Sequence, residues 1–319
     1  MTSSLTRRSQ TPVKRDPPPN VFSVKVVVIG GAGFMGSHLV ERLIAAGNSV
    51  DVVDDLSSGA LANLAEARSV GGLLKIHHLD ARFDEMATLI GMRHPDVVYD
   101  LSLFDRVDRS VQRQSRAVGA MISTLESARR YGVGKVVVTV PATSLYGQPA
   151  VSALPVKEGD IAPRGVRGVI ARAVIDLLRA YRDQHAVEFT ALALTSVYGP
   201  RQHPAGGVVA ELLTAADAGL PGRLDGGGRQ TRDFLFVDDA VDAIARAGER
   251  GSGLVINIGT GIQTTICDVW SLVAPGAAAE TVPARPDDLP RFAVSAARAR
   301  IHLGWTPWTD LADGIARLR

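Results

Sequence analysis

The sequence predicts an α/β protein whose core is a parallel β-sheet with helices on both faces. Short runs of apolar, mainly β-branched residues recur between residues 26 and 194. Most of their connections are long enough to hold a helix that crosses over the sheet, and a glycine-rich turn directly follows the first run. Strands that are apolar on both sides and joined in this way are typical of a doubly wound parallel sheet.

The predicted elements follow one another as strand, turn, helix and strand. Residues 26–29 form the first predicted strand, and apolar residues then recur at helical spacing from Leu39 to Ile44 before Gly47. This spacing predicts a helix over residues 34–46. Further strands are predicted over residues 50–53, 73–76, 97–99, 136–140 and 191–194, and further helices over about 104–130 and over 167–185.

The chain beyond about residue 200 is irregular and rich in glycine and proline, which predicts a smaller, mixed C-terminal lobe. We therefore expect a flexible tail over residues 1–23, a first lobe over 24–195 and a second lobe mainly over 196–319. From the second lobe the chain is expected to cross back to the main sheet.

Composition argues against several classes of protein. The formal net charge is only +2, and the one basic cluster lies in the predicted tail, so nucleic-acid binding is not expected. Neither an apolar run of about 18 residues for a membrane span nor a signal-peptide stretch is found. The single cysteine, Cys267, has no partner for an internal disulfide. We expect a cytoplasmic protein without a metal site. Trp270, Trp305 and Trp308 are predicted to be core or lobe-packing residues, and Cys267 a buried small apolar group.

The glycine-rich turn has the sequence Gly30-Gly31-Ala32-Gly33-Phe34-Met35-Gly36. Glycines at this spacing permit a tight turn, a close approach of backbone N–H groups to a pyrophosphate, and close packing of helix on strand. The N-terminus of the following helix would face the phosphates. The alternative is a glycine-rich turn in an unrelated α/β protein. The position between strand and helix favours a Rossmann-type dinucleotide-binding lobe.

Two acidic residues refine this hypothesis. Asp54 ends the second predicted strand, where a carboxylate accepts hydrogen bonds from the adenosine ribose and repels a 2′-phosphate, so NAD is favoured over NADP. Asp80 follows the third strand and is placed for the adenine edge. Alternatively, Asp80 caps a helix over residues 81–90.

With these features the sequence resembles the extended short-chain dehydrogenase/reductase family, in particular its NAD-dependent nucleotide-sugar epimerases and dehydratases, over about residues 24–318. The resemblance rests on the glycine loop and on further motifs that occur in the order and at the spacing of the family. These are Asp54-Asp55-Leu56-Ser57-Ser58-Gly59, Val107-Asp108-Arg109-Ser110-Val111, Ser144-Leu145-Tyr146-Gly147, Val197-Tyr198-Gly199-Pro200-Arg201-Gln202, Gln230-Thr231-Arg232-Asp233-Phe234, Asn257-Ile258-Gly259-Thr260-Gly261 and Leu303-Gly304-Trp305-Thr306-Pro307.

The resemblance implies which residues bind ligands. A nucleotide diphosphate-sugar would lie in the C-terminal lobe, with Arg232 and Arg285 at its phosphates and Ser196 where the family has an asparagine. The alternative for each arginine is a surface ion pair. The residues implied for NAD are Gly30, Gly33, Phe34, Met35, Gly36, Asp54, Asp80, Ala81, Leu101, Ser102 and Leu103.

The resemblance also implies a homodimer formed through the helices at about 104–130 and 167–185. Apolar residues of the second helix are placed to face either the partner or the core, and the sequence does not separate these alternatives. They are Ile170, Val174, Leu177 and Leu178.

The catalytic positions of the family are replaced in this sequence. A family member uses a Ser or Thr, a tyrosine that takes a proton, and a lysine one helical turn after the tyrosine. The matching positions here are Ala142, Arg167 and Ala171, and no tyrosine lies between Tyr146 and Tyr181. Because the pKa of an arginine exceeds about 12, Arg167 is not a general base at neutral pH. It is either an anion-binding residue or an exposed residue at the start of a helix.

Three residues are weaker candidates for the chemistry. Thr143 lies next to the position of the family's hydroxyl and reaches the site only if the strand ends or bulges there. Asp105 is either a substitute acid/base or a member of an ion pair with Arg106, and His203 is a pocket candidate in a loop. Two functions remain: an enzyme with a rewired site, or a non-catalytic relative that binds NAD or a nucleotide sugar as a sensor, scaffold or partner of an active paralogue.

Overall fold

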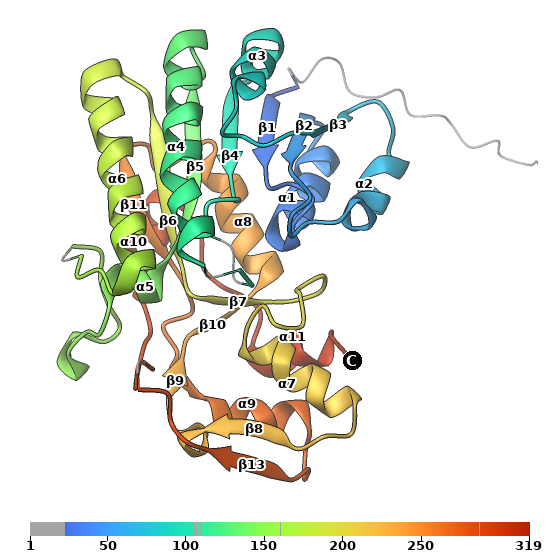
Figure 1. Ribbon diagram of the computed structural model, residues 1–319, viewed down its shortest axis with the longest axis vertical. Coiled ribbons are helices and arrows are strands. Elements are labelled where there is room, and N and C mark those ends of the chain that lie inside the picture. The colour runs from blue at the N-terminus through green and yellow to red at the C-terminus, as the bar shows by residue number, and fades with distance from the viewer. Residues whose placement is uncertain (1–22, 105–106, 109, 160, 287) are drawn as a thin grey trace, which may run out of the picture.

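The main sheet has seven parallel strands in the order β11-β6-β5-β4-β1-β2-β3 (Figure 1). The computed structural model describes residues 23–104, 107–108, 110–159, 161–286 and 288–319. This sheet confirms the predicted α/β class with its doubly wound topology, because the strand order reverses direction on either side of β1. The strands are β1 (Lys25–Ile29), β2 (Ser49–Asp54), β3 (Leu74–His78), β4 (Val97–Asp100), β5 (Lys135–Pro141), β6 (Phe189–Leu194) and β11 (Leu254–Ile258).

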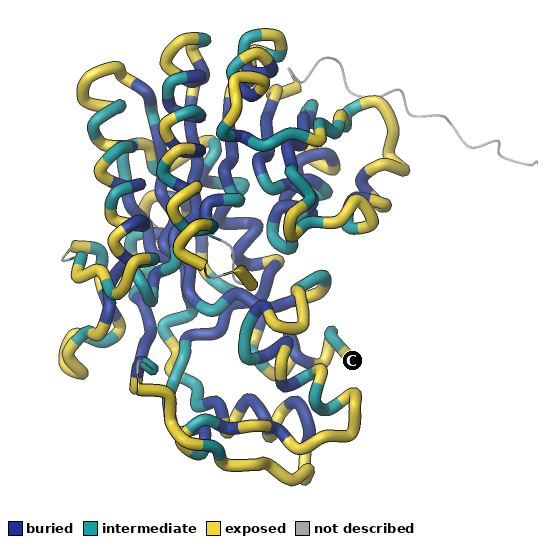
Figure 2. Tube along the Cα trace, in the orientation of Figure 1, coloured by how far each residue is buried: buried dark blue, intermediate teal, exposed yellow. Residues whose placement is uncertain are grey.

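Both faces of the sheet are covered because successive side chains of a strand point in opposite directions. In β1, Val26 and Val28 belong to one apolar core, whereas Val27 and Ile29 belong to the other. Helices α1 (Phe34–Ala45), α8 (Val237–Ala247) and α10 (Ala297–Leu303) contribute to the first core. Helices α3 (Asp84–Arg93), α4 (Val111–Tyr131), α5 (Ala142–Tyr146) and α6 (Gly165–His185) contribute to the second. Figure 2 shows the main strands buried behind α4 and α6, whose outer turns are exposed.

Helix α4 begins at Val111, several residues later than the predicted start near 104. Ser110 caps the helix: its hydroxyl accepts a hydrogen bond from the backbone N–H of Arg113 at 3.2 Å, and its own N–H donates to Asp108 at 2.9 Å. Residues 105, 106 and 109, which include the candidate Asp105, lie outside the described residues. The Ser110 cap fixes the start of the helix at Val111. Apolar spacing alone does not reveal this start.

The apolar residues named on α6 face the core. Ile170, Val174 and Leu178 are buried in the second core, and Leu177 is partly buried against it. Two other apolar residues of the same helix, Val166 and Val169, are exposed. For the four named residues, the structure therefore decides for the core over a partner. The apolar residues on the outer face of α6 are Val166 and Val169.

A smaller group of elements lies at the carboxyl ends of the main strands (Figure 1). Within it, β8 (Gly222–Asp225) pairs with β13 (Ala279–Val282), β7 (Ser196–Tyr198) with β10 (Phe234–Phe236), and β9 (Thr231–Arg232) with β12 (Thr264–Thr265). Trp270 packs beneath Gly222, where a Cβ would lie 2.5 Å from the indole. The helices of this group are α7 (Val208–Asp217), α9 (Ile266–Val273) and α11 (Leu311–Ala316). The remaining short helices are α2 (Ala65–Ser69) and the 3₁₀ turns η1 (Leu61–Leu64), η2 (Val151–Ala153) and η3 (Gly226–Gly228).

Two of the expected buried residues are exposed. The Cys267 thiol is free and lies at the surface, and Trp308 is 54% exposed, whereas Trp270 and Trp305 are buried. Cys267 occupies the second position of α9, on the face turned away from the core residues Ile266 and Val269. The expectation that Cys267 is buried is therefore wrong, and Trp308 is not a core residue, because residue type alone does not reveal which face of an element a side chain occupies.

Within the described residues, none of the helices combines the length and apolar character needed to cross a bilayer. The same residues bring together no group of three His, Cys, Asp or Glu side chains that could hold a metal ion.

Buried Asp239 ties the C-terminal segment to α8. Its carboxylate accepts hydrogen bonds from the N–H groups of Trp308 at 2.9 Å and Thr309 at 3.0 Å, and from the Thr309 hydroxyl at 2.8 Å. The Trp305 indole donates to the Asp239 carbonyl at 2.9 Å. One side chain thus anchors a segment that is distant in the sequence.

We expect Asp239→Ala to lower the free energy of unfolding by about 2–4 kcal/mol, because buried donors would lose their acceptor. Urea unfolding measures the change. The matched control is Asp238→Ala, whose side chain is half-exposed in a 3.7 Å ion pair with Arg317 and should cost under about 0.5 kcal/mol. Equal losses for the two neighbours would contradict the anchoring role.

Candidate functional site

The glycine loop brings the start of α1 directly over the end of β1. Gly30 has a φ of +77°, and its carbonyl accepts a hydrogen bond from the Gly33 N–H at 3.1 Å. A Cβ on Gly36 would lie 2.0 Å from that same carbonyl oxygen. Gly33, the N-cap of α1, has no side chain to cap the helix. The first-turn N–H groups therefore point toward the carboxyl end of the sheet, where an anion would be favoured.

A first cleft of about 450 Å³ opens in front of this loop. It lies where the strand order reverses, the place where ligands bind in open α/β sheets. The structure places all eleven residues implied for NAD in the lining, and their contact with the cofactor stays a prediction. They are Gly30, Gly33, Phe34, Met35, Gly36, Asp54, Asp80, Ala81, Leu101, Ser102 and Leu103.

The Asp54 carboxylate is fixed at the end of β2. It accepts hydrogen bonds from the N–H groups of Ala32 and Leu56, both at 2.8 Å. Burial raises the pKa of Asp54, and the two backbone hydrogen bonds oppose that rise. Each carboxylate oxygen keeps a further acceptor position for a ligand hydroxyl. The residue therefore fits the ribose-binding role predicted for it.

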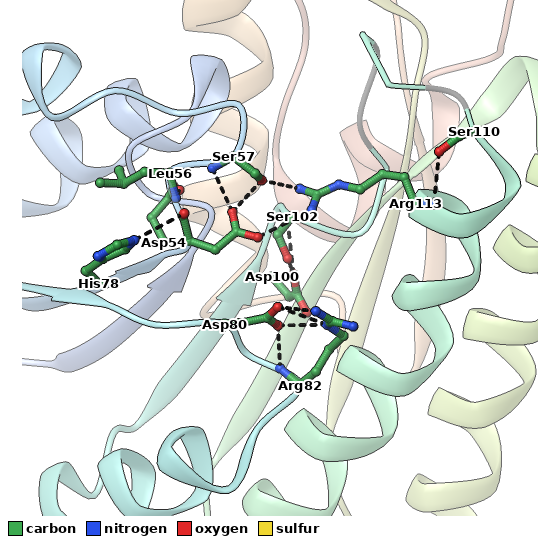
Figure 3. Close-up of polar contacts among 11 residues, drawn as sticks. Asp54, Leu56, Ser57, His78, Asp80, Arg82, Asp100, Ser102, Ser110 and Arg113 are labelled. Carbon is green, nitrogen blue, oxygen red and sulfur yellow. Dashed lines mark hydrogen bonds and ion pairs between the residues drawn. The ribbon is translucent and has the colours of Figure 1, made fainter.

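Charged residues from α4 and from the loop after β2 line this cleft and contact one another (Figure 3). Arg113 reaches from α4 to the Ser57 hydroxyl at 2.8 Å and to Asp55 at 3.3 Å. Burial alone would raise the pKa of Asp55. Hydrogen bonds from Ser57 and the charge of Arg113 outweigh burial, and the pKa lies below its ordinary value. Sequence reasoning missed Arg113, because an arginine at the start of a helix has the same pattern as a solvated helix face.

Asp80 is paired with Arg82 and does not cap a helix. The Arg82 guanidinium donates to both Asp80 oxygens, and these hydrogen bonds lower the pKa of the carboxyl. Because α3 begins only at Asp84, the alternative of a cap for residues 81–90 is wrong. Asp80 instead remains in the lining of the first cleft.

Asp100 is a fully buried carboxyl at the end of β4. Its Oδ1 accepts hydrogen bonds from the Ser102 N–H at 3.1 Å and hydroxyl at 2.8 Å, whereas Oδ2 has no partner among the described residues. Burial raises the pKa of Asp100 to about 6. Ser102 lines the first cleft. The buried Asp100 therefore fixes the position of Ser102 through these two hydrogen bonds.

A second cleft of about 610 Å³ lies between the main sheet and the smaller group of elements. All three residues implied for the nucleotide sugar, Ser196, Arg232 and Arg285, are in its lining. The fold thus brings together residues from distant parts of the chain. Their contact with a ligand stays a prediction.

The two arginines differ in how they are held. Arg232 is largely buried and donates to the carbonyls of Thr231 at 2.6 Å and Leu289 at 2.7 Å and to the Asp288 carboxylate. Its pKa is lowered by burial, which Asp288 opposes. The Arg285 side chain is 65% exposed and bound to Asp225 at 2.6 Å. Both arginines therefore form ion pairs within the cleft, and Arg285 is the easier to turn toward a ligand.

The three positions that the sequence predicts to be replaced, Ala142, Arg167 and Ala171, separate in the structure. Ala142 and Ala171 are fully buried in the second core, and neither belongs to the described lining of the first or the second cleft. Strand β5 ends at Pro141, which meets the condition stated for Thr143, and Thr143 lines the second cleft. The cleft therefore offers a hydroxyl beside the position at which the family has one.

Arg167 lies where the two clefts meet. It lines the second cleft from the first turn of α6, and its Nη2 donates to the carbonyl of Phe104, a residue of the first cleft, at 3.2 Å. The guanidinium also stacks over the Phe104 ring, 5.3 Å from the centroid. Gln202 and Gly206 line both clefts. Arg167 is thus half-buried at the junction, unlike an ordinary exposed arginine at a helix start.

The phenols near the site are held in other contacts. The Tyr146 hydroxyl donates to Asn257 at 2.7 Å, and the Tyr198 hydroxyl, although Tyr198 lines the second cleft, donates to the Leu311 carbonyl at 3.4 Å. Burial raises the pKa of each phenol far above the ordinary value of a tyrosine. Among the described residues of the second cleft there is no lysine. Neither phenol is therefore suited to accept a proton at neutral pH.

The loop between β7 and α7 forms a wall common to both clefts. Arg201, with a φ of +65°, donates to Glu41 at 2.7 Å and to the Ser37 hydroxyl at 3.3 Å on α1. The Gln202 side chain donates to the carbonyls of Val197 and Gly206. His203 lines the first cleft. The loop is therefore fixed to α1 through Arg201 and to its own flanking residues through Gln202.

Comparison with known proteins agrees with this arrangement. A family model described as the NAD dependent epimerase/dehydratase family matches residues 26–259. A UDP-glucose 4-epimerase of Mycolicibacterium smegmatis is 38% identical over 311 residues, which cover 92% of this chain and 97% of that protein. Two solved structures are 30% identical and cover 92% of this chain and 97% of theirs: UDP-glucose 4-epimerase from Thermotoga maritima with UDP-glucose (TM-score 0.85) and that from Thermus thermophilus in complex with NAD (TM-score 0.82).

We expect Gly36→Ala to weaken NAD binding by about 100-fold or more, because the new methyl group would displace α1 from the Gly30 carbonyl. Calorimetric titration with NAD measures the loss. The control is Gly119→Ala on the exposed side of α4, where a Cβ meets nothing within 4 Å. That change should leave NAD affinity unaltered and stabilise the protein by about 0.5–1 kcal/mol.

Asp100 should make stability depend on pH. Above its ordinary pKa of 3.8 the unfolded chain releases a proton that the folded protein keeps up to about pH 6. The folded state therefore loses stability as the pH rises through this window, by up to about 3 kcal/mol. We expect the unfolding free energy of Asp100→Asn to increase relative to wild type from pH 4 to pH 6.5 and then to stay level. A difference that does not vary with pH would contradict this assignment.

Proposed function

The chain belongs to the NAD-dependent epimerase/dehydratase family, and on this premise we propose that it acts on a UDP-sugar in the second cleft with NAD in the first. The observation that carries the proposal is the contact of Arg167 with Phe104, which joins the two clefts. NAD supplies an acceptor and donor of hydride, and the chain's own residues bind, orient and shield the reactants.

The two lobes divide the binding in this proposal. Residues 24–195 hold mainly the cofactor, and residues 196–319 hold mainly the sugar nucleotide. Uridine is favoured because the relatives described above are UDP-glucose 4-epimerases. Arg232 and Arg285 supply guanidinium groups for the diphosphate, since arginine binds phosphate oxygens in pairs.

The reaction we propose is epimerisation, dehydration or related 4-keto chemistry in a rewired site. Ala142 and Ala171 supply no hydroxyl and no amine, and Arg167 keeps its proton at neutral pH. Thr143 is the hydroxyl of the lining that is nearest in sequence to the replaced position. We assign to Thr143 a hydrogen bond to the sugar and to Arg167 the binding of negative charge.

The second candidate function is binding without turnover, as a sensor, a scaffold or a partner of an active paralogue. One observation favours it: the described lining of the second cleft holds no lysine, and its phenol, Tyr198, donates to Leu311. A positioned general base contributes about 10²–10⁴ to a rate, so a site in which neither a phenolate nor a lysine takes part is expected to lose much of the family's turnover.

We also propose that the protein is a homodimer in which α4 and α6 pack against their copies. The two helices lie side by side (Figure 1), and they expose Val111 and Ile122 on α4 and Val166 and Val169 on α6. Exposed apolar side chains gathered on neighbouring helices favour association. The cytoplasmic location stays a prediction of the sequence.

Identification of the bound nucleotide and a turnover assay test the first candidate. The purified protein is heated, and the released nucleotide is identified by mass. The protein is then incubated with NAD and with UDP-, dTDP- and GDP-sugars, and the products are separated by chromatography. We expect NAD to copurify and a UDP-sugar to be changed. Absence of any nucleotide binding would contradict both candidates.

A triple variant separates the two candidates. Arg167→Tyr, Ala171→Lys and Ala142→Ser together restore the family's catalytic side chains. If the wild type changes no sugar and this variant does, binding without turnover is the function. Turnover by the wild type decides for the enzyme. Copurification of NAD with the variant shows that it still folds.

A further inference from the structure

Three residues join two sides of the first cleft. The Arg113 guanidinium on α4 donates from Nη2 to the Ser57 hydroxyl at 2.8 Å and from Nη1 to the Asp55 carboxylate at 3.3 Å (Figure 3). The Ser57 hydroxyl in turn donates to Asp55, which closes a ring of contacts. Both Arg113 and Asp55 line the first cleft. The ring therefore links α4 to the loop after β2 at the cleft itself.

The order of the strands shows what this link spans. Strands β4 and β2 are not neighbours, because β1 lies between them. Neighbouring strands lie about 4.8 Å apart, so the ends of β4 and β2 are separated by about 10 Å. Helix α4 follows β4 along the chain, and the loop with Asp55 and Ser57 follows β2. The link therefore spans the crevice that opens at the end of β1, where α1 begins.

Both ends of the link are fixed to the fold. Arg113 lies in the first turn of α4, and its backbone N–H donates to the Ser110 hydroxyl at 3.2 Å. In the loop after β2, the Leu56 N–H donates to the Asp54 carboxylate at 2.8 Å, so the loop is bound to the residue predicted to hold the ribose. The side chains of Arg113 and Asp55 are only 17% and 30% exposed. Water therefore screens their ion pair less than one on an open surface.

We propose that Arg113, Ser57 and Asp55 form a strap across the first cleft, which slows both the entry and the release of the dinucleotide. The inference rests on the proposed function, since it takes NAD to lie in this cleft. A dinucleotide with its pyrophosphate at the start of α1 and its ribose at Asp54 lies next to the strap. It passes the strap when it enters and again when it leaves.

Such a strap changes the rates of binding and leaves the affinity unchanged. Because Arg113 binds groups of the chain itself, the strap opens before the dinucleotide enters and again before it leaves. Each opening breaks the same two charge-assisted contacts. Loss of the strap therefore raises both rates by one factor, and the dissociation constant, which is their ratio, stays the same. A residue that binds the cofactor directly behaves differently, since its loss weakens affinity mainly through faster release.

The two rates for NADH test the strap. Protein loaded with NADH is mixed with excess NAD, and the fading fluorescence of bound NADH gives the release rate. Mixing NADH with nucleotide-free protein gives the entry rate. We expect Arg113→Gln to raise both rates about tenfold and to leave the dissociation constant within about threefold. Asp55→Asn should have the same effect, and the double variant should be no faster than either single one, because each change opens the same strap.

The control is Arg129→Gln on the same helix, whose exposed side chain pairs with Glu126 at 2.8 Å and is not in the described lining of the cleft. It should leave both rates unaltered. Unchanged rates in Arg113→Gln and Asp55→Asn would overturn the strap and leave the proposed function standing. A weaker affinity with unaltered entry would also overturn it, because Arg113 would then bind the cofactor itself.

Failure of the wild type to bind NADH or NAD would overturn the proposed function instead. Binding of NADH by a variant shows that the variant folds. If Arg113→Gln does not fold, Asp55→Asn decides.

Discussion

The contact of α1 with the end of β1 is the constraint on which both clefts depend. The missing side chain of Gly36 lets the helix stand against the Gly30 carbonyl, so the helix start faces the first cleft. The same helix carries Ser37 and Glu41, which bind Arg201 and thereby position the loop that walls both clefts. A displacement of α1 would therefore disturb the first cleft directly and the second cleft through Arg201.

Sequence patterns predicted the features that depend on local chemistry. The strands from β1 to β6, the glycine loop and the position of Asp54 follow from apolar runs, backbone freedom and the end of a strand. The start of α4 escaped prediction because apolar spacing does not show where Ser110 caps the helix. The exposure of Cys267 escaped it as well, since a residue's face depends on tertiary packing.

The second cleft was harder to predict, because its residues are assembled by long-range contacts. Buried Asp233 shows the cause: its carboxylate accepts hydrogen bonds from the N–H groups of Thr260 at 2.8 Å, Gly261 at 3.0 Å and Val294 at 3.2 Å. It thereby fixes two segments, one at Thr260 and Gly261 and one at Val294, around its neighbour Arg232. The resemblance to a family predicted Arg232 as a binding residue. Only the fold shows that the next residue, Asp233, has a structural role. The junction of Arg167 with Phe104 likewise had no signal in the sequence.

The chain returns to the main sheet after it has formed the smaller group of elements, so the main sheet is not built from one continuous part of the sequence. Strand β11 pairs with β6 from Leu254 to Ile258, and α8 packs against α1, although both elements follow the chain's excursion into the smaller group. A fragment that ended near residue 195 would lack both and would present β6, whose six residues are all buried, as a bare sheet edge. Unprotected apolar edges recruit other strands. The main sheet is therefore no autonomous folding unit of the first 195 residues, and it can be completed only after the ribosome has passed β11.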